Sequence, residues 1–165
     1  MIPFTVADIM TKDVFAVSPE TSLITAARLF ATRHITGAPV IDAVGRVLGV
    51  ITLSDLVDPD RDRSDRVGTS VFYRRTHDRV QVSHGEAAVT ADGVVSDVMS
   101  PFVLAVRDQA PLLDAAKLMV AEDVHRLLVL KEGKLAGIVS TTDVLRSLVR
   151  TAEEIQREDR HKPAR

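Results

Sequence analysis

Apolar residues recur at helical spacing in two segments, one near each end of the chain. The two stripes consist of Leu23, Ala26, Ala27 and Phe30 and of Leu112, Ala115, Ala116 and Met119. Intervals of three and four residues place such side chains on one face of a helix, so each segment predicts an amphipathic helix. Before the first stripe, SPETS at 18–22 offers Ser and Thr as N-caps, and Pro19 and Glu20 suit a helix start.

Short runs of apolar and β-branched residues surround both predicted helices. An extended piece precedes each helix, at 14–17 and 103–106, and a second helix opens at Ser54-Asp55 and at Thr142-Asp143. The strands predicted after each first helix span 38–41 and 47–52, and 127–130 and 135–140. Tight turns at Gly45 and at Glu132-Gly133 separate the two strands of each pair. Each half of the chain therefore predicts the order β-α-β-β-α.

The two halves match each other when the chain is shifted by 89 residues. VADIM at 6–10 then meets VSDVM at 95–99, and after one extra residue near Val44 the offset becomes 88, so that GVITLSDLV at 49–57 meets GIVSTTDVL at 137–145. One such unit is too small to bury its own apolar faces. We therefore expect an α/β (α+β) fold in which two repeats, 1–57 and 94–150, pack sheet to sheet with pseudo-twofold symmetry.

The remaining segments break this symmetry. DPDRDRSDR at 58–66 alternates acidic and basic residues and is interpreted as the start of a solvated linker at 58–93. Two β-prone runs within 70–83 predict a small hairpin, either a surface decoration or a flap that contacts a partner or ligand. The helical stripe after Asp143 continues to Ile155 and could pack on the module or on a second protomer. From 151 to 165 we expect a helix end and a charged tail that frays.

Composition removes several function classes from consideration. The 165 residues carry a net charge of −2, which gives no basic excess for nucleic acid or an anionic membrane. No apolar stretch approaches the roughly 20 residues that span a bilayer, and the start lacks the pattern of a signal peptide. Five scattered His residues and no Cys argue against a metal site. The lack of Cys suits a reducing compartment, and we expect a cytoplasmic protein.

The repeated sequence resembles the CBS domain, named after cystathionine β-synthase, in its tandem form, the Bateman module. The resemblance covers about 5–57 and 94–150 and rests on the ordered set TSLITAARLF, ITGAPVID and GRVLGVITLSDLV, echoed by PLLDAAKLM and VHRLLVLKEGKLAGIVSTTDVL. It implies a non-catalytic regulatory sensor that binds AMP, ADP, ATP or S-adenosylmethionine as a regulatory ligand, without a catalytic cofactor. It also implies a disc-like homodimer that transmits the ligand state to a partner protein.

Thr52 with Asp55 and Ser140 with Asp143 occupy matching positions where a strand runs into a helix. A carboxylate can accept two hydrogen bonds from the hydroxyls of a ribose, and the start of a helix favours an anion. The same residue types are standard helix N-caps, so capping is an open alternative. The recurrence of the motif within the family pattern favours ligand binding, and one residue can serve both roles.

The resemblance builds each cleft from both repeats. One cleft would contain Ser140 and Asp143 with Val14, Ile35 and Thr36, and the other Thr52 and Asp55 with Val103, Val124 and His125. The apolar candidates for sandwiching a purine, with core packing as the alternative for each, are Val14, Ile35, Val50 and Ile138.

One pair of residues distinguishes the two repeats. His125 and Arg126 stand where the first repeat has Thr36 and Gly37, and a cationic pair suits a phosphate. This pair leads us to favour the Asp143 cleft. Gly49 and Gly137 would either let the backbone approach a ligand or relieve crowding.

Two rival functions are open at this point. A structural dimerisation module without a physiological ligand would keep Asp55 and Asp143 as helix caps. A small enzyme acting on a nucleotide is the other rival, but the sequence offers no nucleophile–base pair and no catalytic carboxylate set. We therefore expect no enzymatic activity.

Overall fold

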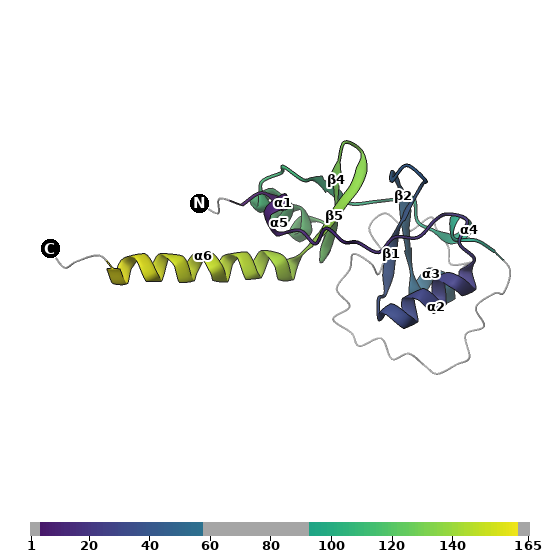
Figure 1. Cartoon of the computed structure of the whole chain (residues 1–165), viewed down its shortest axis with the longest axis horizontal. Coiled ribbons are helices and arrows are strands. Elements are labelled where there is room, and N and C mark those ends of the chain that lie inside the picture. Colours follow the sequence, from purple (N-terminus) through teal and green to yellow (C-terminus); the bar gives the residue numbers. More distant parts are fainter. Residues whose placement is uncertain (1–3, 58–92, 162–165) are drawn as a thin grey trace.

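The computed structural model describes residues 4–57 and 93–161. The linker and the hairpin predicted within 58–93 lie outside the described residues, apart from Gly93. Figure 1 shows two small sheets side by side, each with its own helices, and one long helix that extends from the second half. The prediction of a mixed α/β fold made of two similar halves is confirmed.

The first half follows the predicted order, with one exception. Its main elements are α2 (Leu23–Arg33), β1 (Gly37–Ile41), β2 (Val47–Thr52) and α3 (Leu53–Val57). β1 and β2 pair antiparallel, and α2 begins at the N-cap Ser22, whose hydroxyl accepts a hydrogen bond from the Thr25 N–H at 3.2 Å. The strand predicted at 14–17 is only a single parallel bridge between Val17 and Val40.

The second half repeats this arrangement with a longer final helix. Its main elements are β3 (Ala105–Arg107), α5 (Leu112–Ala121), β4 (Arg126–Lys131), β5 (Lys134–Ser140) and α6 (Thr141–His161). β4 pairs parallel to β3 and antiparallel to β5. Residues 156–161 are helical, so the fraying expected for this part of the tail is wrong. Gln, Arg and Glu are good helix formers, which accounts for the extension.

The two halves exchange their leading segments. The exchanged helices are α1 (Val6–Ile9) and α4 (Val95–Val98), which are the matched VADIM and VSDVM segments. The Val6 N–H donates to the Ala110 carbonyl at 2.9 Å, so α1 lies against the second half. The Val95 N–H donates to the Thr21 carbonyl at 2.8 Å, so α4 lies against the first. The segment that precedes the first half therefore completes the second half, and the segment that precedes the second half completes the first.

The hydrophobic cores show the same exchange. The core of the second half includes Val6 and Val50 from the first, both fully buried. The core of the first half includes Val95 and Val98 from the second. Because each core contains side chains from both halves, neither half buries its full apolar surface alone. This is the shared core that the repeat predicted.

Gly49 and Gly137 make this exchange possible. Val50 and Ser100 exchange two backbone hydrogen bonds of 2.9 Å, and Thr11 and Ile138 do the same at the equivalent place. A Cβ atom at Gly49 would lie 2.4 Å from the Ser100 carbonyl oxygen, and one at Gly137 would lie 2.8 Å from the Thr11 carbonyl oxygen. The glycines therefore admit backbone from the other half rather than a ligand.

We expect Gly137→Ala to destabilise the fold by about 1–3 kcal/mol, because the added methyl group forces Thr11 away from β5. Urea unfolding followed by circular dichroism measures the change. Gly133→Asn is the matched control in the same hairpin: no atom lies within 4 Å of a Cβ there, and Asn tolerates the positive φ of 76°. Equal stability of Gly137→Ala and the native chain would contradict the packing described.

Candidate ligand-binding site

The two Asp residues of the repeated motif both act as helix caps. The Asp55 Oδ2 atom accepts hydrogen bonds from the Thr52 N–H at 2.8 Å and from the Thr52 hydroxyl at 2.7 Å. The Asp143 Oδ2 atom accepts from the Ser140 N–H at 2.9 Å and from its hydroxyl at 2.6 Å. The Ser140 hydroxyl in turn accepts the Asp143 N–H at 3.3 Å, which completes a capping box. The capping role is thus present without any ligand.

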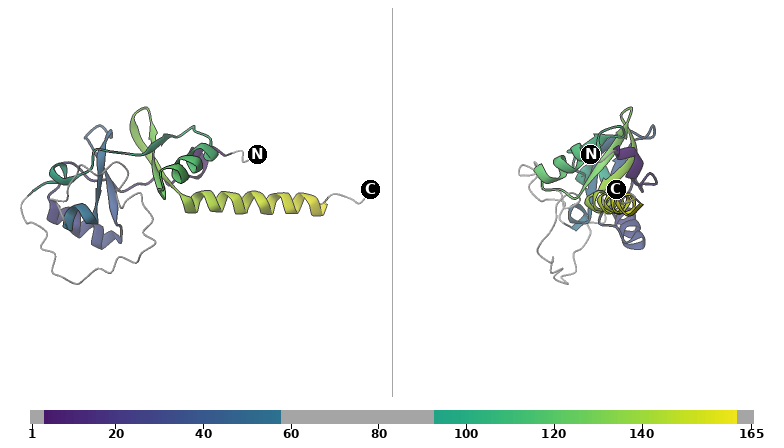
Figure 2. Two further views of the ribbon diagram at one scale, coloured as in Figure 1. Left: turned by 180° about the vertical axis from the view of Figure 1, so that it is seen from behind. Right: turned by 90° about the vertical axis from the view of Figure 1, so that its left-hand side faces the viewer.

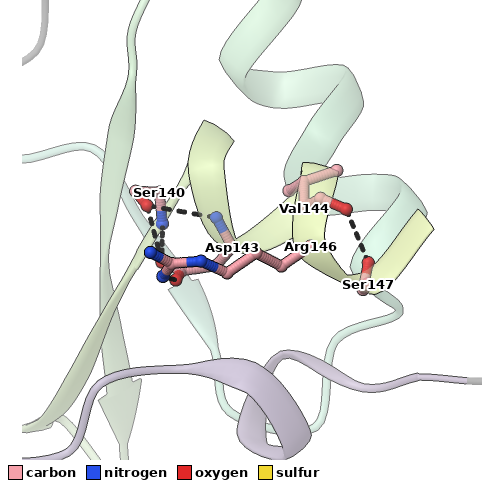
Figure 3. Close-up of polar contacts among 5 residues, drawn as sticks. All are labelled: Ser140, Asp143, Val144, Arg146 and Ser147. Atoms are coloured by element: carbon pink, nitrogen blue, oxygen red, sulfur yellow. Dashed lines mark hydrogen bonds and ion pairs between the residues drawn. The ribbon is translucent and has the colours of Figure 1, made fainter. Parts of the chain in front are cut away.

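The two caps differ in their accessibility. Asp55 and Thr52 are 7% and 1% exposed, so this cap is enclosed by the first half. The Asp143 side chain is 15% exposed, and its Oδ1 atom lies 3.4 Å from an Arg146 guanidinium nitrogen. Figure 3 shows Arg146 reaching back along α6 toward the Asp143 and Ser140 pair. Because the Arg146 side chain is 77% exposed, it can move away from the Asp143 carboxylate at little cost.

An inter-repeat pocket of about 410 Å³ joins side chains from both halves. Val14, Ile35 and Thr36 line it from the first half, and Arg126 and Ile138 line it from the second. These five were among the predicted site residues, and the structure brings them together. The pocket presents apolar surface beside one guanidinium group, a combination that suits a ligand with a flat ring and an anionic group.

Five further lining residues of the inter-repeat pocket were not among the candidates: Asp13, Phe15, His34, Gly37 and Pro39. Asp13 and Phe15 flank Val14, and His34 precedes Ile35 at the end of α2. The Arg33 guanidinium lies 4.3 Å from the centroid of the Phe15 ring. The sequence offers one signal for Asp13, Phe15 and His34, which is their position beside predicted residues. The place of His34 also depends on its left-handed backbone (φ 53°) at the end of α2, which the sequence pattern did not predict.

Asp143 faces a second pocket instead, of about 390 Å³, between α1 and α6. Asp8, Thr11, Arg146 and Arg150 also line this second pocket. Hydrogen bonds from the Thr5 backbone and hydroxyl lower the pKa of Asp8, so its carboxylate is charged at neutral pH. The segment 11–14 contributes to the walls of both pockets, so the cleft predicted around Asp143 is divided into two neighbouring parts.

His125 and Arg126 do not act on one cleft as predicted. Arg126 lines the inter-repeat pocket, whereas His125 lines a third pocket, of about 390 Å³, between α5 and α6. His125 lies just before β4, of which Arg126 is the first residue, and the two side chains diverge where the strand begins. Val124 lines that third pocket. Val124 and Val50 are buried in the core of the second half, and Val103 packs against this core. Core packing therefore accounts for Val50, Val103 and Val124.

Two other features of the described residues bear on function. Within 4–57 and 93–161, no cluster of three or more His, Cys, Asp or Glu side chains could hold a metal ion. Over the same ranges, every helix is too short or too polar to cross a bilayer.

Comparison with known proteins identifies the repeats. The CBS domain family matches residues 6–60 and 95–150. The chain belongs to the CBS domain family. Two chloroplastic CBS domain-containing proteins of Arabidopsis thaliana, CBSX1 and CBSX2, are each 33% identical, over 87% and 93% of this chain. The matches span 64% and 67% of the lengths of those two relatives.

Solved structures of other CBS pairs have the same fold. The crystal structure of CBSX2 in complex with AMP has a TM-score of 0.66 and 31% identity, and the match covers 90% of this chain and 98% of that one. The CBS domain pair of protein MJ0100, in complex with 5′-methylthioadenosine and S-adenosylmethionine, has a TM-score of 0.61 and covers 90% of this chain and 98% of that one. At 18% identity, the second similarity concerns the fold alone. The tandem CBS architecture is confirmed.

The unequal burial of the two caps predicts unequal losses of stability. Asp55→Ala leaves the buried Thr52 N–H without its carboxylate acceptor and should cost about 1–3 kcal/mol. Asp143→Ala removes a cap that water can partly replace and should cost about 0.5–2 kcal/mol. Denaturant unfolding of both variants without nucleotide measures the difference. A larger loss for Asp143→Ala would contradict this comparison of the caps.

Proposed function

We propose that this CBS pair is a regulatory module without catalytic activity that binds an adenosine-containing ligand in the inter-repeat pocket. The observation that carries the proposal is that Val14 and Ile35 of the first repeat line one pocket together with Arg126 and Ile138 of the second. CBSX2, which is 31% identical in its crystallised form, forms a complex with AMP. AMP, ADP, ATP and S-adenosylmethionine are the candidate ligands.

Each part of such a ligand has a complementary group in or beside the pocket. The side chains of Val14, Ile35 and Ile138 offer apolar surface to a purine ring. The Arg126 guanidinium can donate two parallel hydrogen bonds to a phosphate. The Asp143 carboxylate lines the neighbouring pocket. If the exposed Arg146 side chain moved away, the Oδ1 atom of Asp143 could accept hydrogen bonds from ribose hydroxyls.

The pseudo-symmetric site should bind more weakly. Gly37 stands in the first repeat where the second repeat has Arg126, so the equivalent site lacks that guanidinium group. The residues expected to line it, Val50 and Val124, are 0% and 2% exposed. We therefore propose that the pocket containing Arg126 is the principal ligand site.

Ligand binding at this position can influence how the two repeats are held together. The segment 11–14 forms part of the pocket wall and is joined to β5 by the paired hydrogen bonds of Thr11 and Ile138. A ligand that prefers one arrangement of this segment would shift the population toward that arrangement, which a partner protein could detect. The regulated partner would be a protein that binds one of the two arrangements more tightly.

We also propose that the module is a homodimer. Large apolar side chains are exposed on α5 and α6, including Leu113 at 51% and Leu145 at 61%. A contiguous exposed apolar face is typical of an interaction surface. If no ligand bound, such a face would still support the rival function of a structural dimerisation module.

Isothermal titration calorimetry with AMP, ADP, ATP and S-adenosylmethionine tests the ligand proposal. We expect saturable binding of at least one of them, and a melting temperature that rises with its concentration. No binding of any of the four at millimolar concentration would contradict the proposal and favour the structural module. Chromatography after incubation should return the ligand unchanged, because conversion would instead indicate an enzyme.

Arg126→Gln should weaken the binding of AMP about 10- to 100-fold, because a hydrogen bond to a charged group contributes about 1.5–3 kcal/mol. Arg107→Gln is the matched control, since Arg107 is exposed on β3 and is not among the residues that line this pocket. Calorimetry on both variants measures the effect. An equal dissociation constant for AMP in the two variants would place its phosphate elsewhere.

Asp143→Ala should weaken AMP binding more than Asp55→Ala, because Asp143 lies on the side of the molecule that contains Arg126. Arg126 pairs with Ser140, the capping partner of Asp143, in the β4–β5 register. Dissociation constants measured at a temperature where both variants are folded decide the order. The reverse order would assign the ligand to the cleft beside Asp55.

A further inference from the structure

A methionine lies at each of the two places where one repeat crosses to the other. Met10 is the C-cap of α1 and Met99 is the C-cap of α4. The residues that follow them, Thr11 and Ser100, form the paired backbone hydrogen bonds with the other repeat. Figures 1 and 2 show the chain after α1 running toward the first half and the chain after α4 running toward the second. The two methionines therefore hold equivalent positions in the contact that joins the repeats.

Each of these thioethers lies against a glycine of the other repeat. A Cβ atom at Gly137 would lie 2.7 Å from the Met10 Sδ atom, and one at Gly49 would lie 3.3 Å from the Met99 Sδ atom. Both distances are shorter than an ordinary van der Waals contact, so each sulfur occupies space that the glycine leaves open. The shorter distance shows that the contact is tighter at Met10.

Met10 and Met99 differ from Met119 in their exposure. Met10 and Met99 are partly buried at the borders of the two cores, whereas Met119 is 2% exposed inside the core of the second half. A small oxidant dissolved in water can therefore reach the first two residues much more readily than the third. The chain thus contains its own internal reference for the accessibility of a thioether.

We propose that Met10 and Met99 are sites of reversible oxidation by a hydroperoxide, and that their oxidation loosens the contact between the repeats. With hydrogen peroxide, the thioether sulfur attacks one oxygen atom and the O–O bond breaks. The sulfur is oxidised to a sulfoxide, and the other oxygen leaves as water with both hydrogen atoms. Methionine sulfoxide reductases reverse this modification.

A sulfoxide does not fit where the Met10 thioether lies. Oxidation makes the group larger and polar, while its surroundings are the Gly137 backbone and the apolar border of the core. Burial of the new oxygen without a hydrogen bond is costly, and rotation of the side chain into water leaves a void beside Gly137. Either response weakens the packing that holds Thr11 against Ile138.

The two methionines are followed by different parts of the molecule. The chain after Met10 continues to Asp13 and Val14, which line the inter-repeat pocket. The chain after Met99 continues to Val103, which packs against the core of the second half. Oxidation of Met10 should therefore weaken ligand binding in the inter-repeat pocket more than oxidation of Met99. This consequence rests on the proposed ligand function, whereas the loss of stability does not.

Peptide mass spectrometry of the full chain after graded treatment with hydrogen peroxide tests the modification. We expect sulfoxides at Met10 and Met99 at peroxide concentrations that leave Met119 unmodified. The melting temperature should fall by about 3–10 °C, and methionine sulfoxide reductases should restore it. Oxidation of Met119 as fast as Met10, or an unchanged melting temperature after full oxidation of Met10 and Met99, would overturn the proposal.

The variants Met10→Leu and Met99→Leu separate the two sites. Leu and Met are similar in volume, so both variants should fold and melt close to the native temperature. We expect Met10→Leu to remove most of the fall in melting temperature that peroxide causes, because its contact is the tighter one, and the double variant to remove all of it. A double variant that peroxide destabilises as strongly as the native chain would assign the damage to another residue and refute the proposal.

Calorimetry with AMP before and after oxidation tests the effect on the ligand site. We expect oxidation to raise the dissociation constant of the native chain about 5-fold or more and to leave that of Met10→Leu unchanged. An unchanged dissociation constant in the oxidised native chain would contradict the link from Met10 to the pocket. If the reduced native chain bound no AMP, the proposed ligand function would fail, while the melting temperature would still decide whether oxidation loosens the contact.

Discussion

The structure depends on two places where the backbone of one repeat pairs with a strand of the other. Val50 pairs with Ser100, and Ile138 pairs with Thr11, each through two hydrogen bonds of 2.9 Å. A glycine precedes Val50 and Ile138, because a side chain there would collide with the carbonyl oxygen of the crossing segment. This contact completes both cores, and the chain that continues from Thr11 forms part of the wall of the inter-repeat pocket.

The same contact explains why the proposed ligand site needs two repeats in one chain. The pocket takes Ile35 from one repeat and Arg126 from the other, so neither repeat contains it alone. The repeats share a fold but not their charges, because Gly37 replaces Arg126 in the first. The ligand recognition that we propose therefore depends on the Arg126 side chain and on the pocket that the two repeats form. The Asp residues of the repeated motif cap helices in both repeats, so their presence alone does not identify a ligand site.

Local patterns in the sequence predicted much of the fold. The spacing of Leu23, Ala26 and Phe30 predicted α2, whose N-cap Ser22 is one of the caps that SPETS offered. The helix start suggested at Pro19 and Glu20 is wrong, because α2 begins at Leu23. The exchange of α1 and α4 could not be predicted, because it depends on contacts between residues far apart in the sequence, Val6 with Ala110 and Val95 with Thr21. The separation of His125 from Arg126 also escaped prediction. It depends on the pocket toward which each side chain is directed where β4 begins, and the sequence pattern does not determine that direction.

A crystal structure of the full chain grown with AMP would test the central claim most directly, because it locates the ligand relative to both repeats. We expect AMP in the inter-repeat pocket, with its phosphate on the Arg126 guanidinium and its purine between Val14 and Ile35. Occupancy at the pseudo-symmetric position, beside Val50 and Val124, should be lower. AMP bound only beside Asp55, or both pockets empty at millimolar AMP, would contradict the assignment of the ligand to the pocket that the two repeats build together.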